Sequence, residues 1–173
     1  MLKNPETILA LDPGLRELGY AVLAGKRLVT SGVLSLRTVP RHQRLSAIQG
    51  SLVAWNRAYR PRALVLEHIP RRPLDSLAGL PALGRLIRRF VNRRHLRLAV
   101  YSAKTVRQSV VGDGWAGKRE VTKSLCGSFP ALRVHLTQDR KWKERYWSNM
   151  FDAIALALHH QATHPPSRSR SSD

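Results

Sequence analysis

The clearest structural signal in the chain is Ile8–Gly14, which reads ILALDPG. Four apolar residues that run up to a Pro-Gly pair are typical of a buried β-strand that stops at a turn. The acid between them, Asp12, would stand at the end of that strand. Because a carboxylate beside a core is costly unless something pairs with it, Asp12 is the first candidate functional residue.

Two more acids occupy comparable positions. Glu67 closes the apolar run Ala63–Leu66, and Asp152 opens the apolar helical stretch Ala153–Leu158. Taken singly, each acid is better interpreted as a cap or as the partner of an arginine. Three acids at the ends of buried elements, in a chain with only 11 Asp+Glu residues, together favour a shared cation.

The composition restricts the classes of partner. The 173 residues include 30 Lys+Arg, and the formal net charge is +19, so a polyanion is expected and nucleic acid is the first choice over an anionic membrane surface. No apolar run is long enough to span a bilayer, and the N-terminus lacks the apolar core of a signal peptide. The single cysteine, Cys126, excludes an internal disulfide and fits a reducing cytoplasm, where we expect the protein to act.

Hydrophobic periodicity predicts the order of the elements. Strands are expected over residues 7–12, 19–23, 27–36, 63–67 and 96–101, and helices over 41–59, 77–91, 103–110, 118–126 and 146–161. Residues 130–145 read as irregular. We therefore predict an α/β domain over residues 1–163, with a mixed five-stranded sheet flanked by helices, followed by a disordered Arg/Ser-rich tail over 164–173.

The chemistry of the acids follows if the strands ending at Asp12 and Glu67 are parallel neighbours. Both carboxylates then emerge at one edge of the sheet, and the last helix can present Asp152 between them. Hard oxygen ligands suit Mg²⁺ or Mn²⁺. Two such ions about 4 Å apart can stabilise both the attacking and the leaving oxygen of a phosphodiester. The pattern predicts phosphodiester cleavage.

These motifs also resemble a known family. Ile8–Arg16, followed by Gly19-Tyr20, resembles the opening motif of the RuvC Holliday-junction resolvases, and Leu64–Glu67 is similar to their second acidic strand. Four short motifs resemble the segment that follows, namely Tyr101–Lys104, Val106–Gln108, Val110–Gly112 and Ala116–Lys118. Asp152–Ala157 resembles their acidic final helix. A lone Asp-Pro-Gly would be weak, but the ordered set, spanning about residues 7 to 160, is specific.

The resemblance implies an RNase H-like fold and Mg²⁺-dependent nicking of four-way DNA junctions at two symmetric points during recombination and repair. It also implies a homodimer, with its interface near the helix expected over 77–91, and branch-migration machinery as a further partner. Asp12, Glu67 and Asp152 would be the metal ligands. Arg107 and Lys118 would fall on the family's basic positions near the scissile phosphate. From charge alone, we add Lys104 and Lys123 as phosphate contacts.

One departure from the family concerns the last helix. Members usually carry Asp or His one helical turn before the final acid, and this chain has Asn149 there. An asparagine can coordinate a metal through its carbonyl oxygen, but it cannot take a proton or add charge. We therefore count Asn149 as a fourth residue of the catalytic site and expect weaker activity or a preference for Mn²⁺.

Two further departures concern DNA contacts. Where the family often has an aromatic wedge after the second acid, this chain has His68 to Arg72, and we expect Arg71 and Arg72 to act electrostatically instead. The stretch 133–147 is also long, and its Lys141 and Lys143 alternate with aromatic residues. That alternation suits backbone contact plus base stacking. The alternative, that its tryptophans pack beneath a solvated loop, stays open.

Three functions compete at this point. The leading one is a structure-specific endonuclease acting on junctions. The second is an RNase H-like nuclease on another nucleic acid such as RNA, against which the motifs around residues 106–118 argue. The third is a junction-binding protein with weakened or lost cleavage, and the reason to consider it is that Asn149 stands where the family usually carries Asp or His.

Overall fold

A single mixed β-sheet organises the chain. The computed structural model describes residues 6–69, 79–135 and 141–165, and for residues 141–146 it describes the backbone alone. The sheet has five strands in the order β3-β2-β1-β4-β5. They are β1 (Thr7–Asp12), β2 (Glu17–Ala24), β3 (Arg27–Ser35), β4 (Ala63–Glu67) and β5 (Arg97–Tyr101). The five-stranded mixed sheet expected from the sequence is confirmed.

The sheet changes direction at β1. Strands β1 to β3 form an antiparallel meander, and Gly25 adopts the left-handed conformation (φ 54°) that the tight turn between β2 and β3 requires. On its other side β1 pairs in parallel with β4, and β4 pairs in parallel with β5. The register pairs Leu11 with Leu66, so Asp12 and Glu67 are the next residues along two neighbouring parallel strands. The predicted adjacency of these strands is correct.

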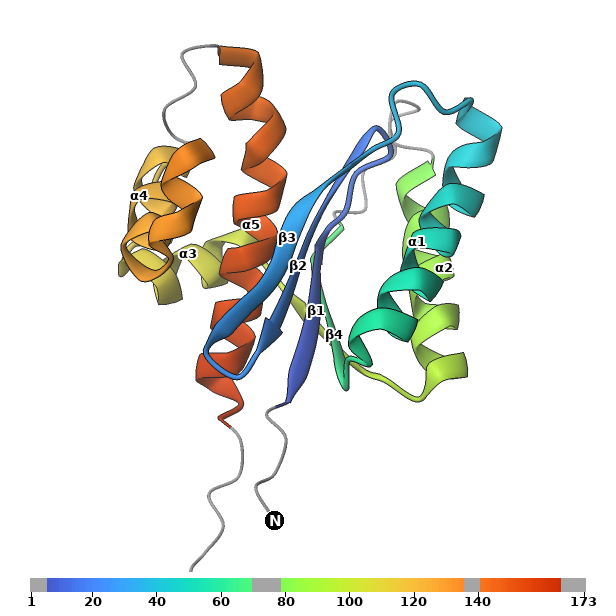
Figure 1. The fold of residues 1–173 in the computed structure, drawn as a ribbon, viewed down its shortest axis with the longest axis horizontal. Coiled ribbons are helices and arrows are strands. Elements are labelled where there is room, and N and C mark those ends of the chain that lie inside the picture. Colours follow the sequence, from blue (N-terminus) through green and yellow to red (C-terminus); the bar gives the residue numbers. More distant parts are fainter. Residues whose placement is uncertain (1–5, 70–78, 136–140, 166–173) are drawn as a thin grey trace, which may run out of the picture.

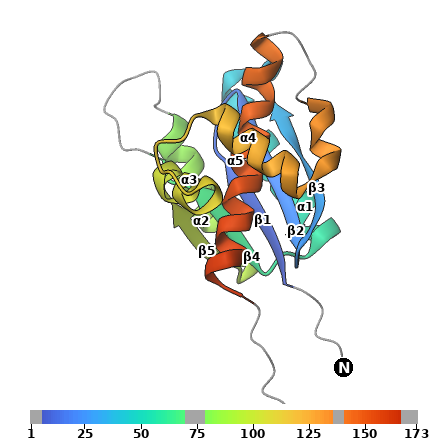
Figure 2. The ribbon, with the colours of Figure 1, turned by 90° about the vertical axis from the view of Figure 1, so that its left-hand side faces the viewer.

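Helices cover both faces of the sheet, giving three layers (Figures 1 and 2). One face is covered by α1 (Arg44–Tyr59), which follows a short 3-10 turn η1 (Arg41–Gln43), and by α2 (Gly79–Arg94). The other face is covered by α5 (Lys141–Thr163), with α3 (Ala103–Val111), α4 (Lys118–Ser128) and the 3-10 turn η3 (Pro130–His135) packed outside it. None of these helices, within the described ranges, is long and apolar enough to cross a bilayer.

Alternation along the strands assigns each side chain to one of two cores. In β1, Leu9 and Leu11 pack with α1 and α2, whereas Ile8 and Ala10 pack with α5. Asp12 continues the second series, and in β4 Glu67 continues the series of Val65, which also packs with α5. The strand pattern therefore directs both acids toward the layer that contains α5.

The last helix begins earlier than predicted. Residues 130–145 were expected to be irregular, but η3 occupies Pro130–His135 and α5 begins at Lys141 rather than at Tyr146. Nothing between Lys141 and Thr163 interrupts a helix, since the stretch has neither Gly nor Pro, and ten of its 23 residues are Ala, Leu, Lys, Glu or Arg. The high charge of residues 141–145 does not prevent a helix, because Lys, Glu and Arg are good helix formers.

Candidate nuclease site

The three predicted acids come from three elements that meet at one edge of the sheet. Asp12 ends β1 and Glu67 ends β4, and both are partly buried. Asp152 lies on α5 between the buried residues Phe151 and Ala153. The helix can approach the sheet here because Gly19, the β2 partner of Asp12, has no side chain. A Cβ atom at Gly19 would collide with the backbone carbonyl of Asn149.

The carboxyl groups interact electrostatically. Burial, followed by the charges of Glu67 and Asp152, raises the pKa of Asp12 to about 8. Burial and the charge of Asp152 raise the pKa of Glu67, and burial raises the pKa of Asp152. Raised carboxyl pKa values mean that ionising the site is unfavourable without a counter-charge. A functional site is where such perturbed groups are commonly found.

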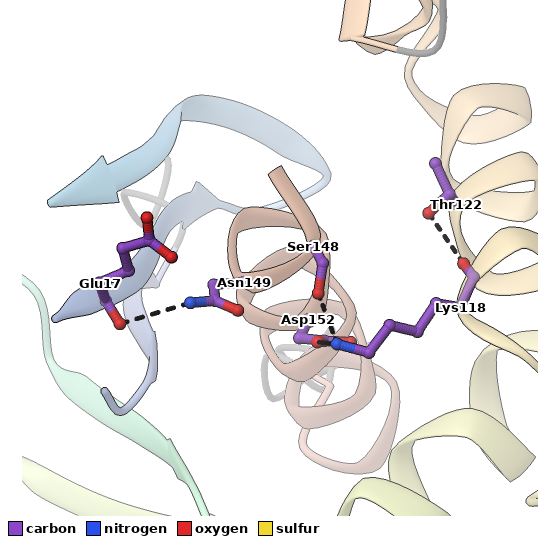
Figure 3. A network of polar contacts seen from close by, with 6 residues as sticks. All are labelled: Glu17, Lys118, Thr122, Ser148, Asn149 and Asp152. Atoms are coloured by element: carbon purple, nitrogen blue, oxygen red, sulfur yellow. Dashed lines mark hydrogen bonds and ion pairs between the residues drawn. The ribbon is translucent and has the colours of Figure 1, made fainter. Parts of the chain in front are cut away.

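Two basic side chains oppose this repulsion. Lys118 and Arg107 each lower the pKa values of Glu67 and Asp152, so both stand close enough to act on these acids. Lys118 is the first residue of α4, and Figure 3 shows its side chain reaching across to α5. Its Nζ atom donates to Ser148 Oγ at 2.5 Å and lies 3.5 Å from Asp152 Oδ2. Ser148 and Asp152 are one helical turn apart, so Lys118 is held between two residues of the same face of α5.

The donor set fits a hard divalent cation. Among the described residues, the side chains of Asp12 and Glu67 have no hydrogen bond or ion pair, so their oxygen atoms are available to a ligand. In the conformation described, however, no three His, Cys, Asp or Glu side chains within residues 6–69, 79–135 and 141–165 are grouped so that they could hold one ion. Lys118 pairs with Asp152, and the three acids repel one another when they are ionised. A single metal-sized site remains a prediction.

Asn149 has a structural contact that the sequence did not suggest. Its Nδ2 atom donates to the backbone carbonyl of Glu17 at 3.3 Å, and its amide oxygen points away from Glu17 (Figure 3). The residue is partly buried, one turn before Asp152 on α5. An asparagine suits this position, since its nitrogen donates to the Glu17 carbonyl and its oxygen stays free to accept a hydrogen bond or to coordinate a metal. An ionised aspartate has no donor for the bond to Glu17.

The predicted basic contacts separate into two groups. Arg107 and Lys118 act on the acids, and Lys104 lies on α3, one turn before Arg107. Lys123 is exposed on α4, but five residues place it about 140° around the helix from Lys118, at 100° per residue. Arg107 and Lys118 therefore act on the acids, Lys104 lies on the same helix as Arg107 and beside Trp115, and Lys123 lies on a different face of α4 from Lys118.

Four predicted contacts cannot be placed. Arg71 and Arg72 lie outside the described residues, and so do the side chains of Lys141 and Lys143, although their backbone forms the start of α5. Trp147, from the same long segment, is partly buried, and its ring lies 4.2 Å from the ring of His135 between centroids. For this one tryptophan the packing interpretation is the better one.

Sequence reasoning missed Ser148 and the carbonyl of Glu17. Ser148 is nine-tenths buried and anchors Lys118, but a serine in a helix carries no signal of such a contact. Spacing offered a weak clue, because Ser148 precedes Asp152 by four residues and so shares its helix face. Neither partnership is visible without the approach of α4 and β2 to α5.

Comparison with known proteins places this geometry in a family. A family model described as crossover junction endodeoxyribonuclease RuvC matches residues 8–160. The protein of that name from Alkalilimnicola ehrlichii is 37% identical over 120 residues, which are 66% of this chain and 72% of that protein. The protein of that name from Pseudomonas aeruginosa is 32% identical over 162 residues, which are 90% of this chain and 86% of that protein.

Solved structures agree on the fold. Thermus thermophilus RuvC in complex with a Holliday junction substrate superposes with a TM-score of 0.72, at 23% identity, over 90% of this chain and 92% of that one. Fowlpox virus resolvase in complex with Holliday junction DNA superposes with a TM-score of 0.60, at 14% identity, over 92% of this chain and 99% of that one. The expected RNase H-like fold is confirmed.

Proposed function

The chain belongs to the RuvC family of crossover junction endodeoxyribonucleases, and on this premise we propose that it nicks four-way DNA junctions at two symmetry-related phosphodiesters. One observation carries the proposal for this particular chain. Three partly buried carboxylates with raised pKa values interact at the end of parallel strands, beside Lys118 and Arg107. Acids that repel one another next to cations form a site suited to a metal ion and a phosphate.

We propose that Asp12, Glu67 and Asp152 hold divalent cations, with Asn149 at the rim of the site. Bound there, the cations would activate a water molecule and stabilise charge on the phosphate oxygens. Lys118 and Arg107 neutralise negative charge at the same edge and can contact the DNA phosphate. The hydrogen bond from Asn149 to Glu17 fixes the start of β2 against α5, so the asparagine also positions the site.

The metal is proposed as Mg²⁺, with Mn²⁺ supporting activity better. A neutral amide at Asn149 leaves the site with less negative charge than a fourth acid would give. Mg²⁺ demands near-ideal octahedral geometry and loses its water reluctantly, whereas Mn²⁺ binds carboxylate sites more tightly. We therefore expect a higher requirement for Mg²⁺ than for Mn²⁺.

The assembly is proposed as a homodimer that acts in the cytoplasm, with branch-migration machinery as a partner. A junction offers two equivalent strands, and a two-fold dimer places one site on each. The apolar stripe of α2 does not provide the surface, because its members Leu83, Ile87 and Val91 are buried within the chain's own core. Contact through α2 would use its exposed face, together with the groove between α1 and α2 lined by residues that include Val53, Arg89 and Arg93.

A junction-binding protein with weakened cleavage is the second candidate. The neutral Asn149, one helical turn before Asp152, is the observation that favours it. A single assay separates the candidates. Purified protein is incubated with a synthetic four-way junction, a linear duplex and an RNA duplex, each with Mg²⁺, Mn²⁺ or chelator.

Paired nicks in the junction alone, dependent on metal, support the proposal. Cleavage of RNA in preference to the junction would mean that the protein is a nuclease for another nucleic acid. Tight junction binding without nicks at any metal concentration would favour the binding-only candidate.

A further inference from the structure

An exposed tryptophan stands beside the proposed site. Trp115 is 80% exposed, more than any other large hydrophobic side chain in the described ranges. It lies in the loop of residues 112–117, between α3 and α4. A tryptophan can bury a large apolar area and one polar N–H, so an isolated ring left in water forgoes most of what it could contribute to the fold. The exposure indicates that the ring is placed to contact a ligand rather than to pack in the chain's own core.

The loop that carries Trp115 is held in one shape. Gly112 closes α3 in the left-handed conformation, with φ of 82°. The Gly114 backbone N–H donates to Gln108 Oε1 at 2.9 Å, and the Trp115 backbone N–H donates to Asp113 Oδ1 at 2.8 Å.

The far end of the loop is fixed as well. The Gly117 N–H donates to Glu120 Oε2 at 2.7 Å, and Ala116, beside the tryptophan, is only 3% exposed. Buried neighbours and bonded amides fix the backbone, so Trp115 is presented in a set direction. A fixed aromatic ring loses little entropy when a ligand binds it.

The loop joins the two helices that supply the site's cations. Three residues after Trp115, Lys118 begins α4 and pairs with Asp152. On α3, Arg107 acts on Glu67 and Asp152. The exposed ring therefore lies in the layer that contains α5, three residues before Lys118, which contacts Asp152.

A lysine completes the surface. Lys104 Nζ lies 4.3 Å from the centroid of the Trp115 ring, a cation–π arrangement, and a Cβ atom at Gly114 would come within 2.9 Å of Lys104 Cγ. The lysine covers part of one face, and an exposure of 80% leaves the rest of the ring accessible. A ring beside an ammonium group offers a stacking surface and a phosphate contact at adjacent points, which is the combination that binds unpaired nucleotides.

Resting on the proposed junction nuclease activity, we propose that Trp115 stacks on a nucleobase released from its pair near the crossover, a few nucleotides from the phosphate that is cut. Lys104 binds a phosphate of the same strand. The loop thereby positions the strand whose phosphodiester reaches Asp12, Glu67 and Asp152. Trp115 is a positioning residue, since it has no contact with the acids.

The test uses the full-length protein and a four-way junction in which 2-aminopurine replaces adenine at the crossover. Wild type, Trp115→Phe and Trp115→Ala are compared in chelator, so that no strand is cut. Lys26→Ala serves as the control, because Lys26 is an exposed cation in the turn between β2 and β3, at the end of the sheet opposite to Asp12. Binding is followed by anisotropy and stacking by 2-aminopurine fluorescence. Circular dichroism and sedimentation check that each variant keeps its fold and its oligomeric state.

We expect Trp115→Ala to bind the junction roughly tenfold more weakly and to lose most of the fluorescence change, with Trp115→Phe near wild type. With metal added, Trp115→Ala should raise KM more than it lowers kcat. The inference would be overturned if Trp115→Ala bound the junction as tightly as wild type and gave the same change in 2-aminopurine fluorescence. A changed oligomeric state in that variant would also overturn it, by making the ring a contact between protein copies.

The outcome is separable from that of the proposed function. If wild type fails to cut any junction but still quenches 2-aminopurine through Trp115, the stacking surface stands and the nuclease proposal fails. If wild type cuts junctions and Trp115→Ala cuts and binds equally well, the stacking inference alone fails.

Discussion

The two faces of the sheet are built from the same strands and both bury an apolar core, but only the face covered by α5 also carries the acids. In β1, Leu9 and Leu11 face α1 and α2 in a core that is apolar throughout. Ile8 and Ala10 face α5, and the same series ends in Asp12, whose pKa is raised to about 8 by burial and neighbouring charge. Both layers bury an apolar core, and the layer of α5 additionally carries repulsion between acids that a proton or a cation relieves. Neighbouring residues of one strand can therefore be fixed by different requirements, Leu11 by packing in a core and Asp12 by the chemistry of the site.

Substituting two adjacent residues tests this contrast most strongly. Asp12→Asn removes a charged ligand with little change in volume, so it should lower junction cleavage on the order of 10²–10³-fold or more while leaving junction binding in place. Leu11→Ala leaves a cavity in the other core and should destabilise the fold by about 2–5 kcal/mol. Cleavage rates, junction affinity and urea unfolding measure both variants. If Asp12→Asn also lost junction binding or its fold, the acid would be structural and the contrast would be wrong.

Removing a cation should lower cleavage more in the layer of the acids than in the opposite layer. Lys118→Ala removes the ammonium group that Ser148 holds beside Asp152, and we expect a fall in cleavage of about 10–100-fold. The matched control is Arg41→Ala, which removes an exposed cation in η1, beside α1 in the opposite layer, and should lower cleavage much less. Single-turnover cleavage of a junction compares the two. Equal losses would mean that the positive charge acts only through general attraction to DNA.

The stability of the metal-free protein should depend on pH in a direction set by the acids. Between pH 3.8, the ordinary pKa of an aspartic acid, and about 8, the folded protein holds a proton on Asp12 that the unfolded chain has lost. The free energy of unfolding should therefore fall as pH rises through this window, by roughly a few kcal/mol, and level off above it. Glu67 and Asp152 act in the same direction, since their pKa values are also raised.

Urea unfolding in chelator at pH 5, 7 and 9 measures this slope, and Asp12→Asn should flatten it. Added Mn²⁺ should restore stability at pH 7 to 9 in wild type, because the cation replaces the lost protons. A stability profile that is identical in wild type and Asp12→Asn would show that the acid is not under electrostatic strain.

Asn149→Asp should give the smallest effect, because two consequences oppose each other. An added carboxylate supplies charge for a second cation, but it cannot donate to the Glu17 carbonyl, which Asn149 Nδ2 contacts at 3.3 Å. We expect the cleavage rate to change by less than about tenfold and the required Mg²⁺ concentration to fall relative to Mn²⁺. Metal titrations of both proteins on one junction provide the measurement. Superimposable titrations would place Asn149 outside the chemistry.

The sequence was most informative where local pattern and tertiary position coincide. Apolar runs ending in Asp12 and Glu67 predicted two parallel neighbours, and the register confirms that they are. It was least informative where a contact joins distant segments. The bond between Lys118 and Ser148 spans 30 positions, and the bond between Asn149 and Glu17 spans 132, so neither leaves a periodic signal. The helix α5 begins at Lys141 rather than at the expected Tyr146, because the charged residues before Tyr146 are themselves good helix formers.

The central claim is that Asp12, Glu67 and Asp152 together bind divalent cations, and crystals grown with Mn²⁺ test it most directly. Anomalous scattering from manganese locates the ions independently of the protein phases. The account predicts at least one ion at the ends of β1 and β4, with oxygen atoms of all three acids at coordinating distance and Lys118 displaced from Asp152. Manganese bound elsewhere, or absent from this edge at millimolar concentration in a protein that still cuts junctions, would contradict it.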